Sequence, residues 1–252
     1  MDNVTSQNMK RILLILLCAS VVTSLPAADL PAQPLGSKDK LIFSEDFERT
    51  ELGPKLKSPI PAFTVADGVL KGRQQRDDHG ATVGATLPLP DGNLILEVRF
   101  RLQTARSISI GCDDKNWKGT HAGHISRLTI KPNGITLMDD KEGVMRNDIY
   151  ALRKSGDAAK KSEGDRLAAS ATADVPVKIK PDAWHQLVLE IVGDQMRVTL
   201  DGQPIGHLKS PGLAHATKPD LRISAWGKDQ EAQLDDLRIW SVKAAAAKMP
   251  AK

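Results

Sequence analysis

The chain has 252 residues, of which 40% are hydrophobic and 26% charged, a balance that is typical of a globular protein and excludes a largely disordered one. Its 35 lysines and arginines exceed its 31 acidic residues by only four and form no basic block, so we expect no nucleic-acid partner. The mean hydropathy of −0.29 excludes a protein with many membrane-spanning segments.

The N-terminus has the pattern of a secretory signal peptide. Two basic residues, Lys10 and Arg11, precede an apolar run over residues 12–22, and small residues follow as far as Ala28. The apolar run is shorter than the roughly 20 residues that a membrane-spanning helix needs. We therefore predict a signal peptide over residues 1–28 and a protein that is secreted or held in the periplasm or cell envelope. The alternative is an anchor that stays uncleaved, and a membrane is expected as a partner only through this segment.

Cleavage near residue 28 would leave Cys112 as the only cysteine of the mature chain, because Cys18 lies in the signal segment. A single cysteine forms no internal disulfide, so the stability of the domain is expected to come from its hydrophobic core. Residues 29–40 contain two prolines and a glycine and are predicted to form a flexible leader.

From residue 41 onwards, hydrophobic and polar residues alternate with a period of two, which is typical of β-strands and not of helices. In residues 94–102, for example, Leu96 and Val98 lie on one face and Glu97 on the other. The predicted strands cover residues 41–47, 63–66, 69–74, 81–87, 94–102, 107–112, 125–131, 135–139, 175–180, 184–192, 196–200, 221–226 and 234–242. Turn pairs such as Asp201-Gly202 separate them, and no β-α-β alternation is present. The sequence predicts an all-β antiparallel sandwich or barrel over residues 41–242.

Residues 147–173 depart from this pattern. They are rich in Ala, Lys, Asp and Ser and contain few β-branched residues. We predict an insertion with short, exposed helices over residues 148–154 and 157–169. Residues 243–252, which are mostly Ala and Lys, are predicted to form a disordered tail.

Four stretches resemble a known superfamily. Residues 183–191, which contain Trp184-His185, and residues 196–205, which contain Asp201-Gly202, resemble a recurrent hairpin of the concanavalin A-like lectin/glucanase superfamily. Residues 43–48 and 234–240 resemble its first and last strands. Within the superfamily, the sequence is most similar to secreted bacterial proteins of the 3-keto-disaccharide hydrolase domain type, which are loosely grouped with family 16 glycoside hydrolases. The resemblance implies a two-sheet jelly-roll sandwich with a concave face that often holds carbohydrate.

The sequence departs from the family 16 glucanases at the catalytic motif. Those enzymes carry E-x-D-x-x-E or E-x-D-x-E on one strand, where the two glutamates act as nucleophile and acid/base. No such run is present: residues 45–48 have the wrong spacing, and Glu97 has no glutamate two or four residues away. A retaining mechanism built on a closely spaced strand pair is therefore not expected.

Polar and aromatic side chains gather in the predicted loop that follows strand 107–112. They are Asp113, Asp114, Asn116, Trp117, His121 and His124. Trp117 is predicted to stack on a sugar ring, and the other side chains to bind hydroxyl groups. If the protein is an enzyme, the predicted catalytic residues are His121, His124 and Asp114, with a His or Asp as general base. The two histidines could also ligate a metal, and the alternative is an ordinary polar loop.

Residues on strand faces extend this prediction. Arg99 and Arg101 share one face, and Arg222, Ser224 and Trp226 share another. We predict that the loop faces Arg99, Arg101 and Trp226 across one cleft, in which all three bind substrate. Because arginine binds carboxylate and sulfate groups in bidentate geometry, an acidic polysaccharide is a candidate ligand. The alternative is ordinary solvent-facing charge on an antiparallel sheet.

Other acidic residues give two further predictions. Asp139 and Asp140 end strand 135–139 and are predicted to bind substrate at the same rim; the alternative is a solvated turn. The superfamily often carries a structural Ca²⁺ between its first and last strands, and the resemblance implies Asp235, Glu45 and Asp46 as its ligands. The alternative is that these carboxylates are merely exposed.

Taken together, these patterns predict an exported β-sandwich protein that acts on or binds carbohydrate. The enzyme hypothesis is a glycoside hydrolase or lyase of the 3-keto-disaccharide type. The missing glutamate pair leaves two alternatives open, a non-catalytic lectin-like module and a structural protein of the cell envelope.

Overall fold

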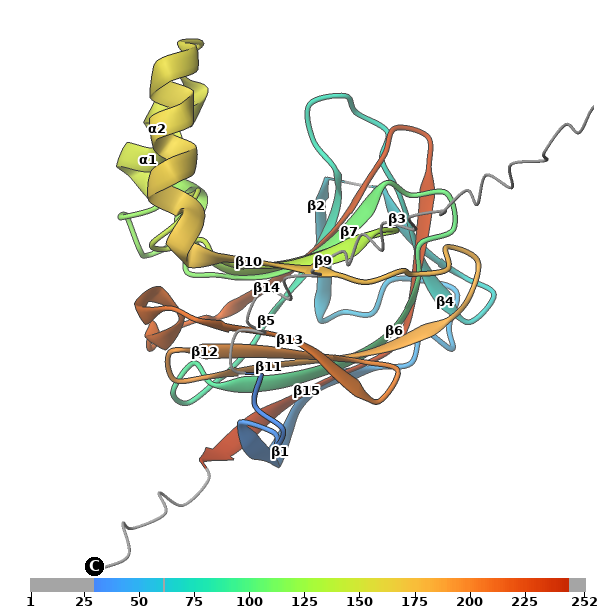
Figure 1. Cartoon of the computed structure of the whole chain (residues 1–252). Helices are drawn as coiled ribbons and strands as arrows, with labels where there is room; N and C mark the ends of the chain where they lie inside the picture. Colours follow the sequence, from blue (N-terminus) through green and yellow to red (C-terminus); the bar gives the residue numbers. More distant parts are fainter. Residues whose placement is uncertain (1–29, 61, 245–252) are drawn as a thin grey trace, which may run out of the picture.

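The computed structural model describes residues 30–60 and 62–244. These residues form two antiparallel sheets packed face to face, and a helical hairpin stands on the outer side of one sheet (Figure 1). The predicted signal peptide and residues 245–252 of the predicted tail lie outside the described residues. Within the described part of the chain, no helix is long and apolar enough to cross a membrane.

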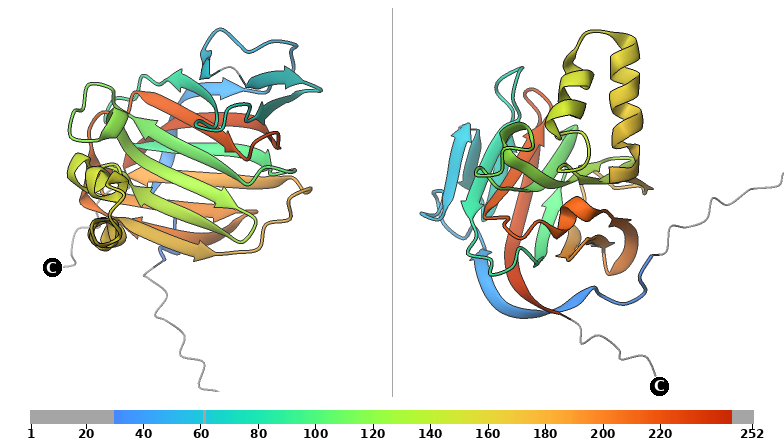
Figure 2. Two further views of the ribbon diagram at one scale, coloured as in Figure 1. Left: turned by 90° about the horizontal axis from the view of Figure 1, so that it is seen from above. Right: turned by 90° about the vertical axis from the view of Figure 1, so that its left-hand side faces the viewer.

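The first sheet, sheet A, has the strand order β13-β12-β11-β6-β15-β4-β3, with β1 paired to β15. Its strands are β1 (Gly36–Glu45), β3 (Phe63–Ala66), β4 (Val69–Arg73), β6 (Leu94–Arg101), β11 (His185–Val192), β12 (Gln195–Leu200), β13 (Gln203–Lys209) and β15 (Glu231–Ala244). The second, sheet B, has the order β10-β9-β8-β7-β14-β5-β2 (Figure 2, left). Its strands are β2 (Leu56–Ile60), β5 (Ala81–Thr86), β7 (Ser107–Asp113), β8 (His124–Lys131), β9 (Gly134–Asp139), β10 (Thr172–Pro176) and β14 (Asp220–Trp226).

The hydrophobic core lies between the two sheets, where alternate residues of each strand point inward. In β6 of sheet A, Leu96, Val98 and Phe100 are at most 1% exposed, and in β14 of sheet B the same holds for Ile223. Burial of alternate residues on both sheets is the arrangement that a period of two predicts. The predicted two-sheet antiparallel jelly-roll sandwich is confirmed.

Two strands, β2 and β13, were not expected from the sequence. β2 contains Pro59, and β13 contains Pro204 and Gly206, residue types that are depleted in strands. Both strands lie at a sheet edge, where a proline removes no ladder hydrogen bond.

The hairpin motif that carries the family resemblance is held together by contacts of Asp201 with the start of β11. Asp201 and Gly202 have φ angles of 49° and 79°, as a tight hairpin turn between β12 and β13 requires. The Asp201 carboxylate contacts Nδ1 of His185 at 2.7 Å and accepts a hydrogen bond from the Gln186 amide at 2.8 Å. The His and Asp of this motif therefore have a structural role in sheet A.

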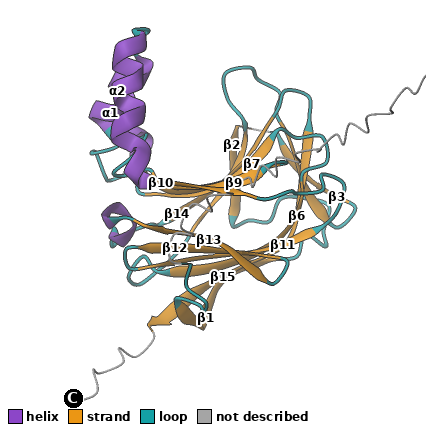
Figure 3. Ribbon diagram, in the orientation of Figure 1, coloured by secondary structure: helices purple, strands orange, loops and turns teal. Residues whose placement is uncertain are grey.

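The predicted helical insertion is confirmed. It consists of α1 (Asn147–Lys154) and α2 (Ala158–Ala168), joined by a short turn and standing on the outer side of sheet B (Figures 1 and 3). Asp157 caps α2 by accepting hydrogen bonds from the amides of Ala159 and Lys160. A Cβ on Gly164 would lie 2.7 Å from Cγ of Arg153, so glycine permits the close approach of the helices. Three 3₁₀ turns complete the fold: η1 (His121–Gly123), η2 (Ala169–Ala171) and η3 (Pro211–Ala214).

The flexible-leader prediction is wrong for its last residues, because β1 begins at Gly36 and pairs with the end of β15. The preceding residues are held on the outer face of sheet A. Arg197 donates a hydrogen bond to the Pro31 carbonyl at 3.0 Å, and the Leu35 amide donates to Glu190 at 3.0 Å. Two residues of the predicted tail, 243 and 244, likewise belong to β15.

Candidate carbohydrate site on sheet B

The outward-facing residues of sheet B form rows that cross the strands, because antiparallel register places partner residues side by side. One row, the cationic row, has three cations separated by glycines. It consists of Lys57, Gly84, Arg222, Gly111 and Arg127, from β2, β5, β14, β7 and β8. The next row, the hydroxyl row, consists of Thr82, Ser224, Ser109, Thr129 and Thr136. Ser109, Thr129 and Ser224 are at most 9% exposed, so the hydroxyl row lies at the base of this face, beside the charged groups.

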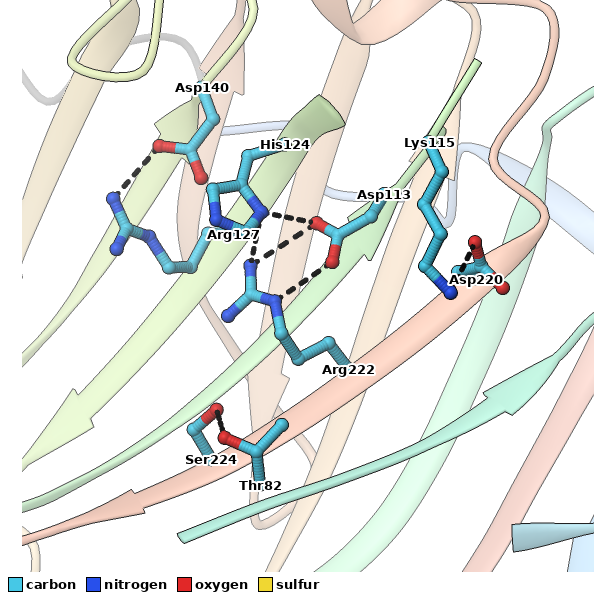
Figure 4. Close-up of polar contacts among 9 residues, drawn as sticks. All are labelled: Thr82, Asp113, Lys115, His124, Arg127, Asp140, Asp220, Arg222 and Ser224. Atoms are coloured by element: carbon cyan, nitrogen blue, oxygen red, sulfur yellow. Dashed lines mark hydrogen bonds and ion pairs between the residues drawn. The ribbon is translucent and has the colours of Figure 1, made fainter. Parts of the chain in front are cut away.

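A cluster of three side chains lies on this face where β7 ends and β8 begins (Figure 4). Arg222 donates from Nε and Nη2 to the two carboxylate oxygens of Asp113, at 2.9 and 3.2 Å, and Nδ1 of His124 lies 2.8 Å from the same carboxylate. Burial would raise the pKa of Asp113, but the hydrogen bond with His124 and the charge of Arg222 outweigh it and hold the pKa below its usual value. Asp113 is therefore ionised at neutral pH.

The contacts of Asp113 also fix the tautomer of His124. An ionised carboxylate only accepts hydrogen bonds, so Nδ1 of His124 carries the hydrogen that points at it. Arg222 Nη2 lies farther from Nδ1, at 3.2 Å, and likewise donates to Asp113. Nε2 of His124 is then the nitrogen with a free lone pair, available as an acceptor or a base.

A second ion pair lies beside this cluster. Arg127 donates from Nη2 to Asp140 at 2.9 Å, and the Asp140 side chain is 0% exposed. The other oxygen of Asp140 and Nε of Arg127 have no partner among the described residues. Burial raises the pKa of Asp140 more than the charges of Arg127, His124 and Arg222 lower it. Two aspartates on one face thus have pKa values shifted in opposite directions.

Two glycines on the floor of the site permit close contacts, and Gly111 leaves room for the Arg222 side chain. A Cβ on Gly111 would lie 2.9 Å from Nη2 of Arg222, and one on Gly84 would lie 2.5 Å from the Leu221 carbonyl oxygen. Beside Arg222 the face is hollowed into a pocket of about 390 Å³. Its polar lining includes Lys57, Ser58, Thr82, Asp113, Lys115 and Arg222. This volume is within the range of small-ligand sites.

The structure places Asp114, a predicted catalytic residue, away from this cluster. Its carboxylate accepts a hydrogen bond from Thr217 at 2.5 Å and lies 3.1 Å from Nε2 of His215. Burial would raise its pKa, but the hydrogen bonds from Thr217 and His215 outweigh it and lower the pKa. With Asn116, it lines a separate pocket beside Lys218. Consecutive residues at a strand end point to opposite sides, so the Asp113-Asp114 pair is split.

His121 and Trp117 lie at the rim of the site. His121 stacks on Tyr150 of α1, with ring centroids 4.1 Å apart, and its ring lies edge-on to His124 at 6.2 Å. Burial and the charges of His124 and Lys154 lower the pKa of His121. Trp117 is 36% exposed and lines a rim pocket with His121. The helical insertion thus supplies part of the site, through a tyrosine that the sequence did not single out.

The predicted cleft between this loop and Arg99 and Arg101 does not form. Both arginines lie on β6 of sheet A, whose outer face is on the opposite side of the molecule. There Arg99 pairs with Asp235 at 3.1 Å, and both guanidinium groups stack on Trp184, at 5.0 and 4.9 Å. Trp226 does lie on the outer face of sheet B, as predicted, but four residues along β14 from Arg222.

The two rim aspartates have different roles. Asp140 belongs to the site, as described above. Asp139 is fully buried and accepts hydrogen bonds from the Ser210 hydroxyl at 2.5 Å and from the amides of Lys141 and Glu142. It therefore fixes a turn and does not face a ligand.

Two of the three acidic residues expected to bind calcium pair with arginines, and the third, Asp46, accepts a hydrogen bond from the Glu48 amide. Glu45 pairs with Arg49, and Asp235 pairs with Arg99. Among residues 30–60 and 62–244, no group of three or more His, Cys, Asp or Glu side chains is arranged to hold a metal ion. Structural calcium on these three carboxylates stays a prediction. His121 and His124 likewise have no third ligand in this part of the chain.

Comparison with known proteins bears on the fold. The sequence matches no protein-family model and no curated protein. The structure is similar to a laminarinase from Rhodothermus marinus, with a TM-score of 0.55 and 12% identity, over 81% of this chain and 98% of the laminarinase. It is also similar to a non-specific endo-β-1,3(4)-glucanase of family GH16, with a TM-score of 0.51 and 12% identity over 83% of this chain and 96% of the other.

A sialidase is a third similar structure, with a TM-score of 0.52 and 14% identity over 84% of this chain but only 19% of the sialidase. The fold is a concanavalin A-like jelly roll. At identities this low the similarity establishes the fold alone, and that fold is the one the resemblance implied. The 3-keto-disaccharide hydrolase type has no support from these comparisons.

Proposed function

We propose that this protein binds carbohydrate on the outer face of sheet B, with Arg222, Asp113 and His124 at the centre of the site. The observation that carries the proposal is the Arg222–Asp113–His124 cluster, which lies at a pocket on the floor of a jelly-roll sheet, beside the hydroxyl row. Such a face presents fixed donors and acceptors to a polyhydroxylated ligand. The predicted signal peptide supports a site of action outside the cytoplasm.

The binding proposal is tested by replacing an arginine on each sheet. Arg222→Gln should abolish retardation of the protein in gels that contain laminarin, mixed-linkage β-glucan or acidic polysaccharides, because it removes the guanidinium at the pocket. Arg99→Gln, the same change on the outer face of sheet A, should leave retardation unchanged. Thermal unfolding of both variants shows that each is folded. Equal retardation of the Arg222→Gln variant and the wild type would contradict the proposal.

A second candidate function, glycoside processing, is favoured by one contact. Asp113 holds Nδ1 of His124 at 2.8 Å and leaves Nε2 free, which is the arrangement of a general base oriented by a carboxylate. The neutral His121 ring lies 6.2 Å away and is the candidate for the second proton transfer. In this proposal the substrate is a disaccharide of the 3-keto type.

Catalysis is tested on a second matched pair of variants. His124→Gln should lower turnover of 3-keto-disaccharides by about 10²-fold or more, the usual contribution of a general base. His185→Gln removes a similar His–Asp contact that lies in sheet A, at 2.7 Å, and should leave turnover unchanged. Glycan binding is measured on the same preparations. Wild-type protein that binds glycan but turns over neither keto nor unmodified disaccharides would leave only the binding function.

A further inference from the structure

The cationic row has a regular spacing. Lys57, Arg222 and Arg127 lie on β2, β14 and β8. One strand separates each cation from the next: β5, which carries Gly84, and β7, which carries Gly111. Neighbouring strands are about 4.8 Å apart, so the backbone positions of successive cations on this row are about 9.6 Å apart along the direction that crosses the sheet. That interval is close to the length of one disaccharide in an extended polysaccharide.

From this spacing we infer that the carbohydrate is a linear acidic polysaccharide that crosses the strands of sheet B and carries about one anionic group, carboxylate or sulfate, per disaccharide. This inference rests on the proposed binding function and names the class of ligand. The sugar hydroxyl groups of such a chain would lie over the hydroxyl row, one step along the strands.

The cations of the row keep hydrogen-bond donors that the protein does not use. Arg222 donates to Asp113 from Nε and Nη2, and its Nη1 has no acceptor among the described residues. Arg127 donates to Asp140 from Nη2 only. Lys57 is exposed and forms no ion pair with any described residue. The aspartates behind the arginines hold them in place, and the outward N–H groups remain for an anion.

The charges on this face favour an anionic over a neutral ligand. The three cations of the row face two aspartates, Asp113 and Asp140, so positive charge exceeds negative charge along the row. The next cation, Lys115, lies 3.4 Å from Asp220 and is 77% exposed. The side of the pocket nearest β2 therefore carries a net positive charge, centred on Lys57.

The test compares each acidic polysaccharide with a form of the same backbone that carries less charge. The panel is chondroitin, chondroitin sulfate, polygalacturonate, and the carboxyl-reduced form of each, compared by retardation in affinity gels at increasing salt. At least one acidic polymer should retard the full protein more than carboxyl-reduced chondroitin and carboxyl-reduced polygalacturonate, which are neutral, and salt should weaken the retardation. If carboxyl-reduced chondroitin sulfate still retards the protein, the recognised anion is sulfate. If only the unreduced polymer does so, the recognised anion is carboxylate.

The matched variants are Lys57→Gln and Lys55→Gln. Both replace an exposed lysine of the β2 region, but only Lys57 belongs to the cationic row. Lys57→Gln should weaken binding of the acidic polymers about fivefold, the effect of one partly exposed charge pair, and Lys55→Gln should not. If carboxyl-reduced chondroitin, which is neutral, retards the protein as strongly as chondroitin and chondroitin sulfate do, the inference is overturned and the binding function stands. If no polysaccharide of any charge binds, the proposed function itself fails.

Discussion

At the scale of single residues, the site depends on which side of a strand each polar group occupies. Asp113 and Asp114 are adjacent in sequence, yet Asp113 joins Arg222 and His124 on the outer face of sheet B, whereas Asp114 joins Thr217 and His215. Asp113 is the residue on which the other two members of the cluster depend. Its removal would leave the guanidinium of Arg222, which is 19% exposed, without its partner.

We predict that Asp113→Asn lowers the free energy of unfolding by about 2 kcal/mol at neutral pH, less than for a fully buried pair because Arg222 and His124 retain some exposure. The folded-state pKa of Asp113 is lowered, so its contribution is present above the unfolded pKa of about 3.9 and is lost as the pH falls through the folded pKa. Urea unfolding at neutral and acidic pH should show a difference between variant and wild type that shrinks on acidification. A pH-independent difference would contradict this account.

At the scale of elements, the segment before β1 is fixed by a buried ion pair on sheet A. Arg197 and Glu190 face each other on adjacent strands at 2.5 Å, with side chains 6% and 3% exposed. Both would face solvent if residues 31–35 did not cover them and supply the Pro31 carbonyl and the Leu35 amide. A pair this buried is stable only when its remaining hydrogen-bond groups are satisfied.

We predict that Arg197→Met lowers the free energy of unfolding by about 3 kcal/mol, because it leaves the Glu190 carboxylate buried without a counter-charge. The double variant Glu190→Leu/Arg197→Met should recover most of that loss. As a control, Arg153→Met breaks the exposed Arg153–Asp165 pair on the helical hairpin and should cost less than about 1 kcal/mol. Urea unfolding measures all three, and a double variant no more stable than Arg197→Met would refute the prediction.

At the scale of the whole molecule, stability comes from the apolar layer between the two sheets. Cys112 lies in that layer at 2% exposure, and burial raises the pKa of its thiol to about 11. The described chain contains no second cysteine with which it could pair. The thiol is therefore protonated and shielded in the folded state.

Accordingly, we predict that iodoacetamide does not label Cys112 in the native protein at neutral pH but labels it fully in urea, as measured by mass spectrometry of the peptide that contains it. Reductant should leave the melting temperature unchanged. Rapid labelling of the native protein would show that the sandwich opens at β7 under native conditions.

The sequence by itself determined most of the strands, the sandwich class and the helical insertion, because burial on one face of a strand imposes a period of two that is visible in residues such as 94–102. It also identified Asp113, His124 and Trp117 within the polar stretch that the site uses. The tertiary structure decided which sheet each strand joins. That assignment sends Arg99 and Arg101 to one outer face and Arg222 and Arg127 to the other. Strand partners come from distant parts of the chain, and the rows that cross them, from Lys57 to Arg127, exist only once the register is fixed.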